Sequence, residues 1–85
     1  MMARFWSDGL PVEVASNHLG APEQLRIQGH AYLVTTVVMR WRIRQHWWRM
    51  PIWREYFVII VPGPLLLRIY HDLPRGGWYV EFLYD

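Results

Sequence analysis

The feature that most constrains this chain is the absence of cysteine from a sequence of only 85 residues. Neither a disulfide nor a thiolate metal site can stabilise it, and a chain this short buries only about 60–65% of the surface that its unfolded form exposes. The core must therefore be dense in apolar mass, and 53% of the residues are hydrophobic, including six Trp, five Tyr and three Phe. We expect one soluble domain in a reducing cytoplasm.

No membrane or targeting segment is expected. Residues 1–9 are charged and lack the continuous apolar region of a signal peptide. The longest apolar stretch, residues 56–67, is interrupted by Pro62, Gly63 and Pro64 and is too short to cross a bilayer.

Short runs of β-branched and aromatic residues, separated by turn residues, favour an all-β fold. We predict a small antiparallel meander of five to six strands, curled into a partly open, SH3-like barrel. Residues 1–9 are expected to be a loosely attached segment and residues 10–85 a single barrel-like domain. The long run 31–44 should bend or bulge within its length. Residues 45–53 are expected to be irregular, because Pro51 interrupts a regular ladder.

The period of two along each strand assigns side chains to faces. It predicts that the apolar residues of the long run lie in the interior with one face of the next strand. That interior set is Met39, Trp41, Ile43, Phe57, Ile59 and Val61. In the last strand, the residues predicted to share one face are Trp78, Val80, Phe82 and Tyr84.

The other face of the long run carries Arg40, Arg42 and Arg44, which lie about 6.6–6.8 Å apart in a strand. This spacing is comparable to that of successive phosphates on an extended single strand. Residues 40–54 contain five arginines and no carboxylate, interleaved with tryptophans, as single-stranded nucleic acid requires. The candidate residues for binding nucleic acid or a partner are Arg40, Arg42, Arg44, Trp47, Trp48, Arg49 and Arg54.

Two other interpretations of the same residues stay open. The arginines can be the solvated side of an amphipathic strand, paired across the sheet with Glu55, Asp72 or Glu81. They can also anchor a protein interface, where Trp and Arg are favoured. Separately, the apolar stretches 56–61 and 65–67 can leave a patch for a partner protein or for a homodimer.

Nothing in the sequence points to an enzyme. The four histidines are scattered, and no pair has the spacing of metal ligands. His71 and Asp72 form an oriented pair without an accompanying nucleophile pattern. No glycine-rich phosphate loop is present. We therefore expect no catalytic residues, no cofactor and no metal.

A series of landmarks runs through residues 10–85 in a distinctive order. They are Pro11-Val12-Glu13-Val14, Trp41-Arg42, Trp47-Trp48-Arg49, Arg54-Glu55-Tyr56-Phe57, Tyr70-His71-Asp72, Gly77-Trp78-Tyr79 and Tyr84-Asp85. The pattern resembles a bacterial family of small uncharacterised proteins. It is also similar to the extreme C-terminal tail of ImuB-type proteins, the inactive Y-family polymerase homologues of the bacterial mutasome. The Pro62-Gly63-Pro64 connection and the run 65–67 are more apolar than this pattern.

The resemblance implies a setting in error-prone DNA repair and a role without catalysis. Our leading hypothesis is a non-enzymatic adaptor domain associated with DNA repair or translesion synthesis. It would offer an Arg/Trp surface to single-stranded DNA or to a DNA-repair protein. The alternative is a protein-interaction or self-association module with no role in nucleic-acid binding.

Overall fold

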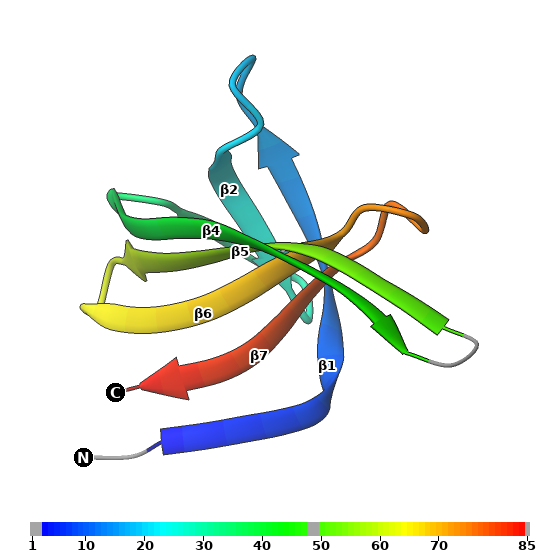
Figure 1. The fold of residues 1–85 in the computed structure, drawn as a ribbon. Coiled ribbons are helices and arrows are strands. Elements are labelled where there is room, and N and C mark those ends of the chain that lie inside the picture. The colour runs from blue at the N-terminus through cyan, green and yellow to red at the C-terminus, as the bar shows by residue number, and fades with distance from the viewer. Residues whose placement is uncertain (1–2, 48–49, 85) are drawn as a thin grey trace.

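The computed structural model describes the backbone of residues 3–47 and 50–84, and the side chains of these residues except 47 and 50. The described residues form seven strands in one antiparallel sheet, in the order β3-β2-β1-β7-β6-β5-β4 (Figure 1). Their bounds are β1 (Ala3–Ser16), β2 (Pro22–Ile27), β3 (His30–Leu33), β4 (Thr36–Trp47), β5 (Met50–Val61), β6 (Leu65–Asp72) and β7 (Trp78–Tyr84). The all-β, antiparallel prediction is confirmed, although these residues form seven strands rather than the five to six expected.

The sheet curls into a half-barrel whose two edge strands, β3 and β4, are joined by a corner of only two residues (Figure 1). The backbone N–H of Val34 donates to the carbonyl of Glu23 at 2.9 Å, and that of Thr35 donates to the carbonyl of Ile60 at 2.8 Å. The corner therefore ties β2 to β5 across the open side. The predicted bend in residues 31–44 is this corner, and a bulge between Val37 and Met39 follows it.

The core lies on the inner face of the curled sheet. Its fully buried members are Leu25, Phe57, Ile59, Val61, Leu67, Ile69 and Val80. The prediction that β5 turns Phe57, Ile59 and Val61 inward is confirmed. Trp6, Tyr32 and Trp78 pack against this cluster from the neighbouring strands.

The last strand changes face along its length. Ile69 pairs with Val80 but Arg68 pairs with Phe82, so Glu81 is an extra residue in the ladder. Beyond this bulge Leu83 packs on the core, whereas Phe82 and Tyr84 lie on the outer face. The prediction that Trp78, Val80, Phe82 and Tyr84 share one face is therefore wrong, because one inserted residue inverts the alternation that follows it.

Two segments are more regular than the sequence predicts. Residues 45–53 do not form an irregular segment: β4 continues to Trp47 and β5 begins at Met50, with Pro51 opposite His46. Pro51 lies where β5 has a neighbouring strand on one side only, a position at which a sheet tolerates proline. Residues 3–9, expected to be loosely attached, belong to β1, which places Ala3 opposite Tyr84.

Strand β1 is bulged between Phe5 and Leu10, where it crosses the outer aromatic side chains of β6 and β7. Gly9 has φ +76°, and a Cβ built on it would lie 2.6 Å from the Tyr70 hydroxyl and 2.8 Å from Tyr79 Cβ. Only glycine suits both the backbone conformation and the close approach. The bulge therefore covers Tyr70, which is buried although it faces outward.

Candidate nucleic-acid interface

Strands β4 and β5 pair from Thr36 with Ile60 to Trp47 with Met50. Strand β6, the next in the sheet, pairs with β5 only as far as Arg54. Residues 44–47 and 50–53 therefore form a two-stranded arm that extends past the rest of the sheet (Figure 1). We call this arm the ribbon. In the sequence, the ribbon lies within residues 40–54, a stretch with five arginines and no carboxylate.

Register decides which way the arginines point. Arg40 lies opposite Phe57, Arg42 opposite Glu55 and Arg44 opposite Trp53. Opposed residues of an antiparallel pair share a face, and Phe57 is in the core. The three arginines, which we call the arginine row, therefore lie on the inner face of the sheet.

The prediction that the arginine row faces away from the interior is wrong. Met39, Trp41 and Ile43, predicted to be interior, lie on the outer face, where the Trp41 ring stacks on Tyr56 with 5.3 Å between centroids. The alternation along β4 was predicted correctly, but alternation alone does not say on which side the core lies. Because β4 is the edge of an open half-barrel, its inner face still reaches solvent and the arginine row remains accessible.

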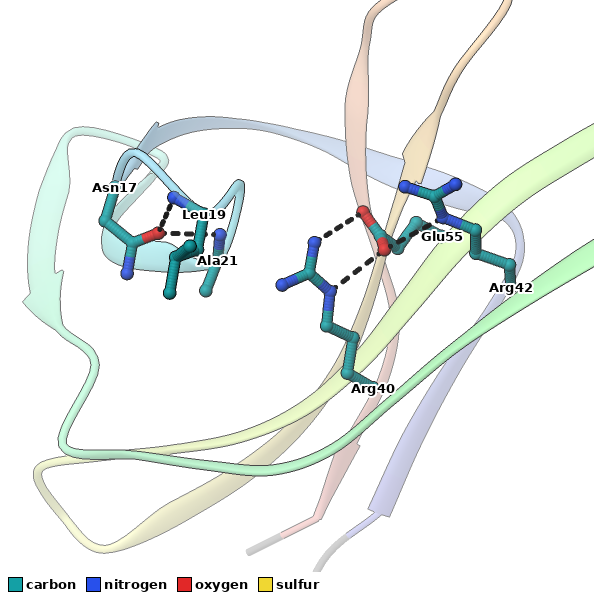
Figure 2. A network of polar contacts seen from close by, with 6 residues as sticks. All are labelled: Asn17, Leu19, Ala21, Arg40, Arg42 and Glu55. Atoms are coloured by element: carbon teal, nitrogen blue, oxygen red, sulfur yellow. Dashed lines mark hydrogen bonds and ion pairs between the residues drawn. The ribbon is translucent and has the colours of Figure 1, made fainter.

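Glu55 holds the first two arginines of the row (Figure 2). Arg40 donates from Nε to Oε2 at 2.9 Å and from Nη2 to Oε1 at 3.2 Å, while Arg42 donates from Nε to Oε2 at 3.1 Å. The carboxylate is almost fully buried. Burial raises the pKa of Glu55, but the hydrogen bonds and charges of Arg40 and Arg42 lower it by more, so the pKa lies below its ordinary value. The cross-strand pairing that the sequence offered as an alternative is thus present at Glu55.

The members of the row differ in what they can still bind. Arg40 is engaged by two nitrogens, is 35% exposed, and has its Cζ 5.1 Å from the Phe57 ring centroid. In the part of the chain that the structure describes, Arg42 is engaged only through Nε and is 61% exposed. Arg40 is therefore a packed structural group, whereas Arg42 keeps both terminal amino groups for a ligand.

Arg44 is the most available member of the row. None of the described carboxylates lies within ion-pair distance of it. Its Cζ lies 5.3 Å from the centroid of the Trp53 ring, which is 40% exposed. An exposed indole beside a guanidinium that pairs with none of the described carboxylates combines a stacking surface with a phosphate ligand. Trp53 was not among the predicted site residues, because its position opposite Arg44 depends on the register of the hairpin.

Arg54 does not belong to this surface. It lies on the outer face, with its Cζ 4.3 Å from the Tyr70 ring centroid and its Nη1 donating to the Tyr56 hydroxyl at 3.3 Å. Trp47 closes β4, but its side chain lies outside the described residues, as do Trp48 and Arg49 altogether. The roles predicted for Trp47, Trp48 and Arg49 stay predictions.

The described residues of this surface offer positive charge and an exposed aromatic ring. Over residues 3–47 and 50–84, no three His, Asp or Glu side chains gather as a metal site. The same residues contain no helix that is long and apolar enough to cross a membrane.

Comparisons with family models, curated proteins and solved structures gave no match to this chain.

Proposed function

We propose that this protein is a non-enzymatic domain that binds single-stranded DNA along the exposed part of the arginine row, in the DNA-repair setting that the resemblance implies. The observation that carries the proposal is that Arg42, just before the ribbon, and Arg44, within it, lie on one face of β4, with Arg44 beside the exposed ring of Trp53. Two cations about 6.6–6.8 Å apart match neighbouring phosphates, and the indole offers a surface for one base. The proposal also includes that the half-barrel is SH3-like and that the protein acts as an adaptor in the cytoplasm.

The salt dependence of binding tests the electrostatic part. With a fluorescent oligonucleotide, we expect affinity to fall with rising salt at a log–log slope of about −0.7 per phosphate engaged. Arg42→Gln/Arg44→Gln protein should lose affinity, and its slope should be shallower by about 1.4. The matched control is Arg4→Gln/Arg26→Gln, which removes the same charge from exposed positions on β1 and β2. Equal losses in the two double variants, or no binding by the wild type, would contradict the proposal.

The stacking part is tested at Trp53. We expect Trp53→Ala to weaken oligonucleotide binding about tenfold, because stacking on one base contributes about 1–3 kcal/mol. Trp53→Tyr keeps an aromatic surface and should retain most of the affinity. Titrations at one fixed salt concentration would show the difference. If the alanine and tyrosine variants bind alike, no base stacks on this ring.

A DNA-repair protein is the alternative partner for the same surface, since exposed Trp and Arg side chains also serve as interface anchors. A protein partner would be held by contacts that are less sensitive to salt than phosphate binding. Oligonucleotide titrations at two salt concentrations therefore separate the two partners.

A further inference from the structure

The outer face of the sheet carries an apolar patch that the proposed DNA site does not use. Two in-register rows of side chains cross it from β4 to β1. The first row is Met39, Val58, Arg68, Phe82 and Phe5, and the second is Thr36, Ile60, Leu66, Tyr84 and Ala3. These ten residues, which we call the outer patch, span five adjacent strands.

Much of the outer patch is open to solvent. Phe5, Met39, Leu66 and Tyr84 are each between 36% and 59% exposed. The ring of Phe82 lies between two of them, with centroids 6.5 Å from Phe5 and 6.1 Å from Tyr84. Exposed apolar side chains that adjoin across several strands, rather than standing singly, point to an interaction surface.

The charges of the outer patch are balanced. Its only charged member, Arg68, forms an ion pair with the neighbouring Glu81 at 2.8 Å and lies over the Phe82 ring at 5.5 Å. The ion pair with Glu81 offsets the charge of Arg68, so the outer patch has no strong net charge to favour DNA or a strongly charged protein as its partner. A two-fold contact centred on this pair would place Arg68 of one copy beside Glu81 of the other, so the surface suits a second copy of itself.

We propose that the outer patch is the interface of a homodimer. A two-fold contact would bury Phe5, Leu66 and Tyr84 of both copies around the two Arg68–Glu81 pairs. A stable interface uses about 20–30 residues on each side, whereas the patch offers ten. The dimer should therefore be reversible and dissociate on dilution.

The interface leaves the arginine rows free. The outer patch and the arginine row lie on opposite faces of the sheet. A dimer would thus present two ribbons, and an oligonucleotide long enough to reach both would be held more tightly than a short one. The dimer itself does not depend on DNA binding, so each proposal can fail without the other.

Sedimentation velocity of the 85-residue chain without DNA tests the dimer. We expect the wild-type sedimentation coefficient to rise from the monomer to the dimer value as the concentration increases from about 1 to about 500 µM. Leu66→Arg and Phe5→Arg should each leave the protein monomeric across that range, because each places a charge in the apolar interface. Circular dichroism of each variant would verify that the sheet is intact.

The matched control is Leu33→Arg, which introduces the same change at an exposed leucine of β3 outside the outer patch. This variant should dimerise as the wild type does. A wild type that is monomeric at the highest concentration overturns the proposal. A dimer that persists in both Leu66→Arg and Phe5→Arg also overturns it. The same holds if Leu33→Arg weakens the dimer as much as those two variants do.

Discussion

Replacement of Phe57 by alanine is expected to remove a large part of the stability of this protein. Phe57 is fully buried in the middle of β5, its ring lies 5.6 Å from that of Trp78, and Arg40 covers it from the open side. Truncating a buried phenylalanine costs about 3–5 kcal/mol through lost burial and the cavity left behind. A domain of this size has about 0.05–0.15 kcal/mol of stability per residue, so the loss is a large share of the total.

Urea unfolding followed by tryptophan fluorescence measures this effect. Phe5→Ala is the matched control, since Phe5 is exposed and its loss should change the midpoint little at concentrations where the protein is monomeric. Phe57→Ala should move the midpoint to much lower urea. Similar midpoints for the two variants would show that the inner face of β5 is not the core.

Substitution of Glu55 is expected to have the second-largest effect. Glu55→Gln removes the charge that holds Arg40 and Arg42 and leaves Arg40 partly buried beside Phe57 without its counter-ion. Breaking a fully buried pair costs about 3–5 kcal/mol, and the partial exposure of both arginines reduces this to about 2–3 kcal/mol.

The pH dependence of the free energy of unfolding tests whether the ion pairs of Glu55 with Arg40 and Arg42 provide this stability. The pKa of Glu55 is lower in the folded protein than its ordinary value of 4.5, so the unfolded chain binds the proton more readily. The stabilisation is therefore complete above pH 4.5 and is lost as the pH falls through the folded pKa. Urea midpoints between about pH 6 and pH 3 should fall more for the wild type than for Glu55→Gln.

The control for the pH experiment is Glu13→Gln. Glu13 is highly exposed and lies 4.0 Å from Arg26 in an open ion pair, so its removal should leave the pH profile of the wild type unchanged. If Glu55→Gln protein loses stability with falling pH as steeply as the wild type, another carboxylate is responsible.

The sequence predicted where strands form better than how they pair. The hairpin around Pro62, Gly63 and Pro64 and the inward face of β5 could be predicted, because turn residues and alternating apolar side chains act locally. The direction of the arginine row could not. It depends on the register of β4 against β5, which places Arg40 beside Phe57, and no local pattern encodes that register.

Because a local pattern does not encode how strands pair, the other differences between prediction and structure have the same origin. A single bulge at Glu81 inverts the facing of Phe82 and Tyr84, and a period of two cannot reveal an inserted residue. Pro51 was expected to interrupt a regular ladder, but it lies on the ribbon, which the neighbouring strand β6 does not reach. For the candidate site, the residue types were identifiable from the basic run, whereas the pairing of Trp53 with Arg44 required the hairpin register.

The position of β1 inside the sheet, next to β7, has a consequence for how the protein is made. Residues 3–16 leave the ribosome well before residues 78–84, which form one of their two neighbouring strands. Until that strand is translated, the sheet stays divided and the apolar residues 56–67 translated in between remain exposed to aggregation. A chain without β7 would therefore lack the strand that joins β1 to β6.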